Sequence, residues 1–321
     1  MRHRFPTGVA LMALGLAACA TAPLEQQGAR ERGALAPPLT ASAKGGMPGF
    51  FDCLRETGAV LVSAHRGGAA PGYPENAIET FEHTTARMQA LLEIDVLKSA
   101  DGVLLLMHDE TLDRTTTGRG PVTAQSFAAL RSLRLKDNEG AETEFRIPTL
   151  EEALVWSEER AFLALDRKDP VTFDEILALV DKHDAFGRVV IATYSLDDAM
   201  NVAALAPAAM IVTPIESLED LETLRAGGVD PAQVIAWTGT ETPRPALYDA
   251  LAGEGVESAF ATLGWWTGSW DSRIRVLEDD TLYLKVTKGA HLVATDRHFE
   301  VAAVLPGVAK LPRCAAATTR R

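Results

Sequence analysis

The sequence has no excess of basic charge and none of the glycine-rich loops that bind nucleotides. Its 321 residues include 31 lysines and arginines against 44 aspartates and glutamates, which gives a net charge of −13. Because proteins hold nucleic-acid backbones with clustered lysine and arginine, this charge argues against a nucleic-acid partner. No dinucleotide fingerprint and no Walker loop follows an apolar run, so a Rossmann enzyme and a nucleoside triphosphatase are disfavoured.

The N-terminal apolar run is too short to span a membrane in the usual way. Residues 5–18 are largely apolar, follow a short basic head, and lead into the sequence LAAC, whose last residue is Cys19. LAAC resembles a bacterial lipoprotein box, which implies a signal peptide over residues 1–18 and lipidation of Cys19. An ordinary secretory signal that is cleaved nearby is the alternative.

Residues 19–50 are rich in alanine, proline, glycine and polar residues, without a sustained apolar period, which predicts a flexible tether. The folded domain is then expected over residues 51–321. Together these segments predict a protein of the bacterial cell envelope that is secreted across the inner membrane, held by a lipid anchor and facing the periplasm. The sequence indicates no particular protein partner.

The folded region alternates strand-like apolar runs with segments of helix length. Four of these segments open with capping boxes, at 149–152, 172–175, 195–198 and 217–220. The alternation predicts parallel βα units, and continuous apolar strands suit a sheet that is buried on both faces. About eight units predict a TIM-type (β/α)8 barrel, with either 233–238 or 257–263 as an extra strand. The apolar runs are 59–65, 91–97, 103–108, 161–166, 188–194, 208–215, 233–238, 257–263 and 290–295.

Polar residues gather where the first four runs end, and the carboxyl ends of barrel strands carry the active sites of this fold. Glu93 and Asp95 are two residues apart on one strand, so both point to the same face. Asp166 and Lys168 have the same spacing on another strand. The residues at these ends are His65, Arg66, Glu93, Asp95, His108, Asp166 and Lys168.

Three carboxylates at one barrel mouth would repel one another strongly without a cation. Glu93, Asp95 and Asp166 are therefore candidate ligands of one divalent ion, Ca²⁺ or Mg²⁺, which both prefer oxygen ligands. Cationic side chains and imidazoles around such an ion suit an anionic substrate, because they hold a phosphate and move protons. Taken alone, the Glu93–Asp95 pair is equally consistent with ion pairs to Arg66 or Lys168.

Several stretches resemble the glycerophosphodiester phosphodiesterase family. AHRGGAAPGYPENAIETF (64–81) is similar to its opening motifs, His-Arg-Gly and Pro-Glu-Asn-Thr. LEIDVLKSADGVLLLMHDETLDRTTTGRG (92–120) resembles the Glu-x-Asp and His-Asp motifs that follow. IPTLEEAL (147–154), ALDRKD (164–169) and VATDRHFE (293–300) look like later landmarks. The likeness is densest over 64–120.

The resemblance implies a metal-dependent phosphodiesterase on a TIM barrel that hydrolyses glycerophosphodiesters to an alcohol and sn-glycerol 3-phosphate. Residues 110–145, after the third strand, match the family's insertion, a small cap over the mouth. Trp237 is implied either to contact the glycerol or to pack in the core. The implied roles are acid–base catalysis for His65 and His108, metal binding for Glu93, Asp95 and Asp166, phosphate contact for Arg66 and Lys168, and bracing of the site for Glu75 and Asn76.

The sequence departs from the family pattern at several positions, among them Asp166 and His298. Asp166 stands where the family has Glu, so the carboxylate is one methylene shorter and is expected to reach a metal through water. His298 stands where the closing motif usually has proline.

Two other functions stay open at this point. One is a phospholipase of C or D type, including lysophospholipase D action on membrane lipids, and the other is a non-catalytic envelope lipoprotein that binds a ligand on an inactive barrel. A disulfide is also open. Cys53 and Cys314 lie near the two ends of the folded region, and the first and last elements of a closed barrel are neighbours. An oxidising compartment permits the bond, and two free thiols are the alternative.

Overall fold

The computed structural model describes residues 46–264 and 268–316. The expected signal peptide (1–18), the lipidation site Cys19 and the tether as far as residue 45 lie outside the described residues. Within the described part, no helix is both long enough and apolar enough to cross a membrane.

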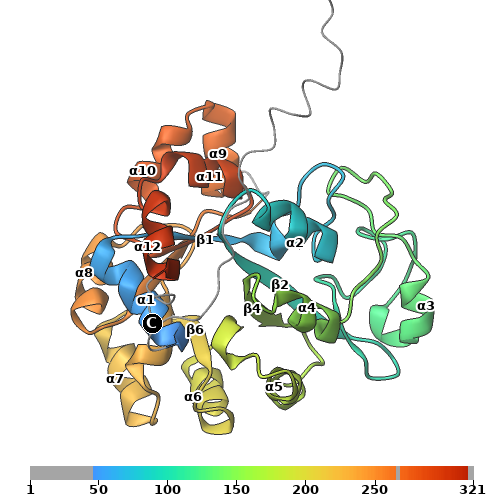
Figure 1. Cartoon of the computed structure of the whole chain (residues 1–321), viewed down its shortest axis with the longest axis horizontal. Helices are drawn as coiled ribbons and strands as arrows, with labels where there is room; N and C mark the ends of the chain where they lie inside the picture. The colour runs from blue at the N-terminus through green and yellow to red at the C-terminus, as the bar shows by residue number, and fades with distance from the viewer. Residues whose placement is uncertain (1–45, 265–267, 317–321) are drawn as a thin grey trace, which may run out of the picture. The chain divides into compact units, whose positions relative to one another are not determined.

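Eight parallel strands close into a barrel, which confirms the predicted fold (Figure 1). The ring closes at β1, which pairs with β2 on one side and with β9 on the other. Helices connect most of the strands, so the architecture is a TIM-type (β/α)8 barrel. In ring order the strands are β1 (Leu61–Ala64), β2 (Leu91–Lys98), β4 (Phe162–Arg167), β5 (Val189–Ala192), β6 (Met210–Pro214), β7 (Val234–Trp237), β8 (Glu257–Ala261) and β9 (Leu292–Thr295).

The extra strand is not one of the two expected, because 233–238 and 257–263 contain the barrel strands β7 and β8. The extra strand is β3 (Leu104–Leu106), which pairs antiparallel with β2 and places Leu106 opposite Val96. Only residues 99–103 join β2 to β3, and parallel strands need a much longer crossover. β3 therefore runs back along β2, and the insertion follows this hairpin rather than a third barrel strand.

The helices begin where the sequence places their caps. Thr149 and Thr172 form complete capping boxes at α4 and α5, Ser195 caps α6, and Ser217 with Asp220 forms a box at α7. Each box satisfies backbone N–H groups that have no partner in the first helical turn. The helices are α1 (Gly46–Thr57), α2 (Ile78–Thr85), α3 (Phe127–Arg131), α4 (Leu150–Ser157), α5 (Phe173–Lys182), α6 (Leu196–Leu205), α7 (Leu218–Ala226), α8 (Pro245–Gly253), α9 (Trp270–Leu277), α10 (Tyr283–Val286), α11 (His298–Val304) and α12 (Leu311–Ala316).

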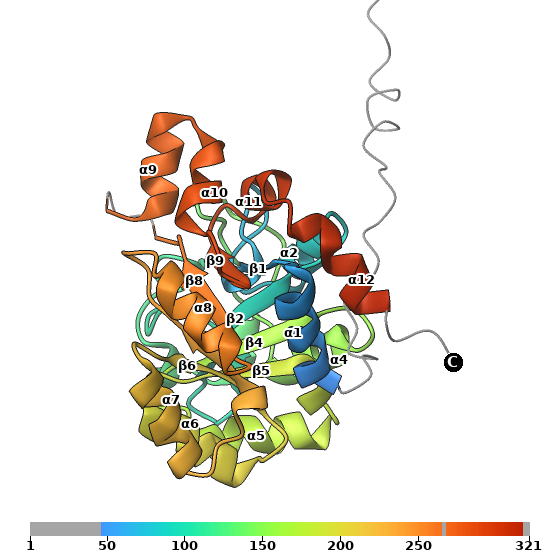
Figure 2. The same ribbon diagram turned by 90° about the vertical axis from the view of Figure 1, so that its left-hand side faces the viewer.

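α1 and α12 lie side by side (Figure 2) and are joined by a disulfide between Cys53 and Cys314, whose Cα atoms are 5.6 Å apart. α1 begins at Gly46, inside the predicted tether, so the expected tether end at residue 50 is wrong. The reason is that Met47 and Phe50 are buried in the apolar cluster that fills the barrel floor. The disulfide therefore lies at the amino ends of the strands, away from the mouth.

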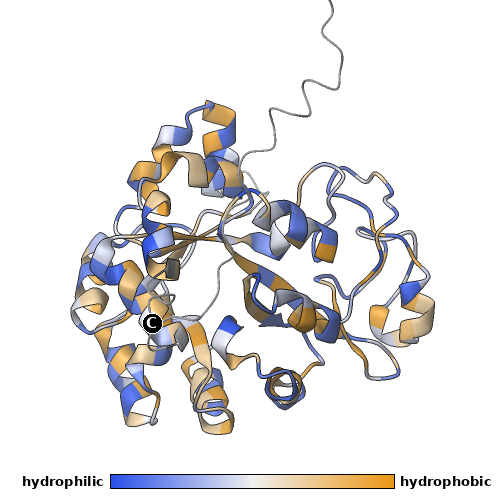
Figure 3. Ribbon diagram, in the orientation of Figure 1, coloured by the Kyte–Doolittle hydropathy of each residue, from blue (hydrophilic) through white to orange (hydrophobic). Residues whose placement is uncertain are grey.

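Within residues 46–264 and 268–316, the buried apolar residues form three clusters. The largest packs the outer faces of the strands against the surrounding helices, and a second fills the barrel floor. Figure 3 shows this pattern as apolar colour along the strands and mixed colour on the helices. The third cluster belongs to the insertion, where Leu112, Val122 and Leu130 pack against Leu105 and Met107 of the β3 region. The insertion is thus anchored on the β2–β3 hairpin.

Candidate active site

The loop after β1 positions His65 and Arg66. This loop is a short helix, η2 (His65–Gly67), in which Arg66 has a left-handed backbone with φ 53°. Its backbone N–H donates to Glu93 Oε2 at 2.8 Å. Gly67 has φ 82°, and a Cβ at this position would lie 2.2 Å from the Phe81 ring, so only glycine fits. The loop is therefore held tightly against Glu93.

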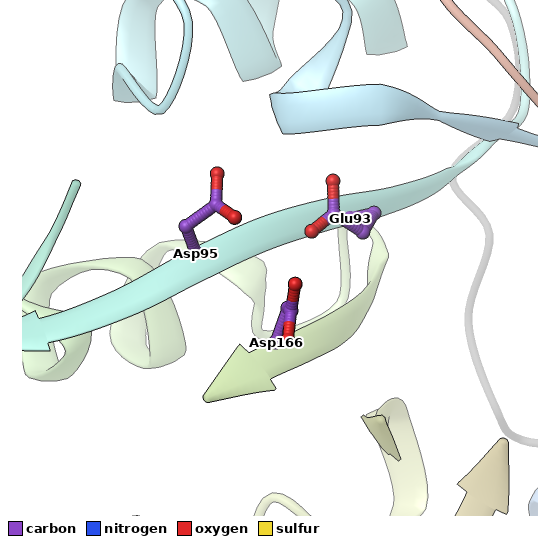
Figure 4. A group of neighbouring side chains, drawn as sticks. All are labelled: Glu93, Asp95 and Asp166. Atoms are coloured by element: carbon purple, nitrogen blue, oxygen red, sulfur yellow. The ribbon is translucent and has the colours of Figure 1, made fainter. Parts of the chain in front are cut away.

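Three carboxylates converge at the mouth (Figure 4). Glu93 and Asp95 project from β2, and Asp166 projects from β4, where it is paired in register with Asp95. One oxygen of each lies within 4.8 Å of the other two. Burial raises the pKa of Glu93 to about 8, and the charges of Asp95 and Asp166 add to the rise. So much negative charge in one place favours a cation, and the three oxygens fit one divalent ion.

Asp95 is held from two sides. Asn76 donates from Nδ2 to Asp95 Oδ2 at 2.7 Å, and its Oδ1 accepts from the Asp95 backbone N–H at 2.9 Å. Lys168 Nζ lies 3.0 Å from Asp95 Oδ1 and 2.6 Å from Asp166 Oδ2. Burial disfavours the charged form of Asp95, but the neighbouring cations, Lys168 foremost, hold its pKa below the usual value. Both expected uses of the acids, ion pairing and metal binding, are therefore compatible with one geometry.

His65 is oriented by an acid at the end of β9. Its Nδ1 lies 2.6 Å from Asp296 Oδ1, and its Nε2 lies 4.0 Å from Glu93 Oε2. Burial lowers the pKa of His65, but the Asp296 hydrogen bond and the charges of Glu93 and Asp296 outweigh it and raise the pKa to about 9. Asp296 Oδ2 accepts from the Gly264 backbone N–H at 2.8 Å. Nδ1 is thus engaged, and Nε2 faces the carboxylates.

His108 has a matching arrangement. Its Nδ1 lies 2.8 Å from Asp109 Oδ1, and Asp109 in turn accepts two hydrogen bonds from Arg114. Arg114 also binds both oxygens of Glu75, which accepts from Arg66 as well. Glu75 is 4% exposed, so it is a buried anchor between two guanidinium groups. The bracing predicted for Glu75 would act through this series of hydrogen bonds, which links the loop after β1 to His108.

A cavity of about 300 Å³ lies at the mouth between these groups. Glu93, Asp95, Asp166 and Lys168 line one side, and residues of β5, β6 and β7 form an apolar wall on the other, namely Val190, Val212, Pro214 and Trp237. Trp237 lines the cavity and also packs against the barrel-floor cluster, and its expected contact with the glycerol stays a prediction. His65 and His108 line the same cavity.

The structure brings together nearly all the predicted site residues, with two differences. Arg66 does not line the cavity, because its guanidinium turns to Glu75, with Nε 3.8 Å from Asp95 Oδ2. No residue of 110–145 lines the cavity either. The phosphate contact by Arg66 and the cap over the mouth stay predictions.

Sequence reasoning missed three functional partners. Asp296 supports His65, Arg114 supports Asp109, and the Tyr194 hydroxyl lies 2.7 and 2.6 Å from the two oxygens of Asp166. A signal existed for two of them. Asp296 directly follows the last apolar run, and Tyr194 ends the run 188–194 two positions after Ala192, so the alternation of faces along a strand predicts that both point the same way.

Comparisons with known proteins identify a matching family, similar sequences and similar structures. A model of the glycerophosphoryl diester phosphodiesterase family matches residues 65–224. A glycerophosphodiester phosphodiesterase of Bacillus subtilis is 31% identical over 221 residues, which cover 59% of this chain and 72% of that protein. The crystal structure of a glycerophosphoryl diester phosphodiesterase from Parabacteroides distasonis is 31% identical, with a TM-score of 0.69 over 77% of this chain and 86% of that one.

A more distant structure has the same fold. It is an Oleispira antarctica phosphodiesterase in complex with the product sn-glycerol-3-phosphate, 19% identical, with a TM-score of 0.58 over 78% of this chain and 98% of that chain. At this identity the likeness concerns the fold alone.

Proposed function

Since the chain belongs to the glycerophosphoryl diester phosphodiesterase family and is a phosphoric diester hydrolase, we propose that it hydrolyses glycerophosphodiesters to an alcohol and sn-glycerol 3-phosphate. The observation that carries the proposal is the convergence of two aspartate-backed histidines and three carboxylates on one cavity.

The two histidines would carry out the proton transfers. Each imidazole has its Nδ1 against a carboxylate, His65 against Asp296 and His108 against Asp109, which leaves Nε2 for the reacting groups. One imidazole takes the proton of the nucleophile, a water or the 2-hydroxyl of the glycerol, and the other gives a proton to the leaving alcohol. Attack by the 2-hydroxyl gives a cyclic phosphate first, which water then opens to sn-glycerol 3-phosphate. Such a pair typically contributes roughly 10²–10⁴-fold per group.

Glu93, Asp95 and Asp166 would hold a divalent cation, Ca²⁺ or Mg²⁺. When bound, such an ion polarises the phosphoryl oxygens and neutralises charge that builds up in the transition state. Lys168 already lies between Asp95 and Asp166, and among the described lysines and arginines it is the one that lines the cavity, so its ammonium would contact a phosphate oxygen. Asn76 keeps Asp95 in place throughout.

The test is hydrolysis of glycerophosphocholine, followed by release of sn-glycerol 3-phosphate. We expect activity with Ca²⁺ or Mg²⁺, loss of activity on exhaustive chelation, and recovery on adding the ion back. His65→Ala and His108→Ala should each lower kcat by roughly 10²–10⁴-fold. Near-normal hydrolysis by both variants would contradict the acid–base assignment, and full activity after chelation would contradict the metal site.

The apolar wall of the cavity favours a second substrate class, lysophospholipids cleaved in the manner of a lysophospholipase D. Val212, Pro214 and Trp237 offer carbon contacts rather than hydrogen bonds to whatever lies opposite the acids. Comparing kcat/KM for lysophosphatidylcholine and glycerophosphocholine under the same conditions separates the two. A higher value for the lipid would make it the preferred substrate.

We also propose that Cys19 anchors the protein to a membrane of the bacterial envelope, with the domain facing the periplasm. The support is the LAAC sequence at the end of the apolar segment. Expression of the full chain and of Cys19→Ser, followed by fractionation and labelling with a radioactive fatty acid, tests it. The wild-type chain should be labelled and membrane-bound, whereas labelling of the Cys19→Ser chain would contradict the assignment.

A further inference from the structure

Tyr194 makes a contact that its burial does not explain. The residue lies two positions after the end of β5, its side chain lines the cavity, and it is 62% exposed. An exposed ring contributes little hydrophobic stabilisation. Its hydroxyl nevertheless lies 2.7 Å from Asp166 Oδ1 and 2.6 Å from Asp166 Oδ2. The hydrogen bond to Asp166, rather than packing, therefore fixes this side chain.

Asp166 needs such support more than the other two acids do. It stands where a glutamate is usual in the resembling motif, so its side chain is one methylene shorter, although one of its oxygens lies within 4.8 Å of those of Glu93 and Asp95. Glu93 is held by the Arg66 backbone N–H, and Asp95 is held by Asn76. Asp166 has only Lys168 and Tyr194 as hydrogen-bond donors among the described residues. Lys168 is shared with Asp95, so Tyr194 is the donor that Asp166 has to itself.

The Tyr194 hydroxyl can orient the Asp166 carboxylate without occupying all of its lone-pair sites. A carboxylate offers about four lone-pair sites, whereas a phenol donates a single proton. With Tyr194 and Lys168 in place, lone pairs of Asp166 stay available on the side of Glu93 and Asp95, where the three oxygens lie within 4.8 Å. Donors around a metal-binding carboxylate commonly raise metal affinity by holding it in one orientation.

We propose that Tyr194 is a positioning residue that orients the short Asp166 side chain for a divalent cation and so compensates for the missing methylene. The proposal rests on the metal dependence proposed above. Tyr194 does not contact the cation in this proposal, and it acts only by orienting the Asp166 carboxylate.

The test measures metal binding directly, by isothermal titration of the metal-free protein with Ca²⁺ alone and with Mg²⁺ alone. Tyr194→Phe, which removes only the hydroxyl, should weaken binding by roughly 10–100-fold. Tyr248→Phe is the matched control, because the Tyr248 hydroxyl is buried in α8 and has no hydrogen-bond partner among the described residues. It should bind the ion like the wild type. Far-ultraviolet circular dichroism and a thermal melt confirm that each variant is folded.

A second pair of variants tests the compensation. In Asp166→Glu the longer side chain reaches the cluster by itself, so adding Tyr194→Phe should cost less than threefold in affinity. An equal loss in both backgrounds would overturn the compensation. Unchanged affinity in Tyr194→Phe, or a raised KM alone, would overturn the positioning role and leave Tyr194 as a wall of the cavity. A wild-type protein that binds neither ion would instead contradict the proposed metal site.

Discussion

His65 and Asp296 are 231 residues apart in the sequence, and their Nδ1 and Oδ1 atoms are 2.6 Å apart. The contact exists because β1 and β9 are neighbours at the point where the barrel closes, with Ala64 opposite Thr295. Asp296 is itself fixed by the backbone of Gly264 and, through its own N–H, by the buried Asp271. The histidine is thus oriented by the last strand of the fold, in the same way that a buried aspartate orients the histidine of a catalytic triad.

Removal of the Asp296 charge should impair catalysis more than binding. In Asp296→Asn the imidazole loses its carboxylate partner, so we expect kcat for glycerophosphocholine to fall by roughly 10²-fold or more, with KM within about threefold of the wild type. Steady-state kinetics with saturating metal measures both constants. Asp181→Asn, an exposed position on α5, is the charge-matched control. A fall in kcat/KM that came entirely from KM would argue that Asp296 only shapes the cavity.

Asn76 offers a way to separate backbone from side-chain effects. It has a left-handed backbone with φ 59° and holds Asp95 through both ends of its amide. Glycine adopts the left-handed backbone without strain, so Asn76→Gly removes only the side-chain amide. Metal affinity should then fall by roughly 10-fold or more. Asn76→Ala removes the same amide and adds backbone strain, so it should also lose about 1 kcal/mol of unfolding free energy relative to the glycine variant. Titration calorimetry and urea unfolding give the two quantities, and equal metal affinity in wild type and Asn76→Gly would show that the amide is dispensable.

The Cys53–Cys314 disulfide should matter for stability and not for chemistry. It joins residues separated by 261 positions and lies at the barrel floor, away from the cavity. Cross-linking so long a loop restricts the unfolded chain, so Cys53→Ser/Cys314→Ser should lose about 2–4 kcal/mol of unfolding free energy. Urea unfolding with and without dithiothreitol measures the loss, and the double variant should not respond to the reductant. A change in kcat of more than about twofold in the folded double variant would contradict the claim that the disulfide at the barrel floor does not affect catalysis at the mouth.

His298 should make the fold sensitive to acid. It is 2% exposed, neither imidazole nitrogen bonds to any described residue, and the groups that influence it are His83 and Asp296. Burial lowers the pKa of His298 to about 4, below the ordinary value of 6.5. The folded state therefore binds fewer protons than the unfolded chain between these values, so the His298 contribution to stability falls as the pH drops from 6.5 to 4.

The measurement is urea unfolding of the wild type and His298→Leu at pH values from 7.5 to 4.5. The stability difference, wild type minus variant, should fall by on the order of 2 kcal/mol across this range. Taking this difference cancels the titration of groups that both proteins share. The free energy of unfolding at pH 7.5 serves as the reference value for each protein. A difference that stays constant with pH would mean that His298 accepts a proton in the folded state as readily as in the unfolded chain.

The amino-acid sequence determined the features that depend on local pattern. Alternating apolar runs and capping residues near Thr149 and Thr172 predicted the βα units and the barrel, because strand period and cap chemistry operate over a few residues. The spacing of Glu93 and Asp95 predicted a shared face, and the two lie together with Asp166 at the mouth. His65 and His108 were identifiable because polar residues at strand ends stand out from apolar runs.

Only the tertiary structure decided which distant groups meet. The direction of β3 depends on the length of one turn, the partner of His65 depends on how the ring closes, and the donor to Asp166 depends on the register of β5 beside β4. Arg66 turned to Glu75 rather than to the cavity, because Glu75 is buried and needs its charge matched. Hydrogen bonds between residues far apart in sequence have no local signature, so the residues that orient the site appeared only once the barrel was closed.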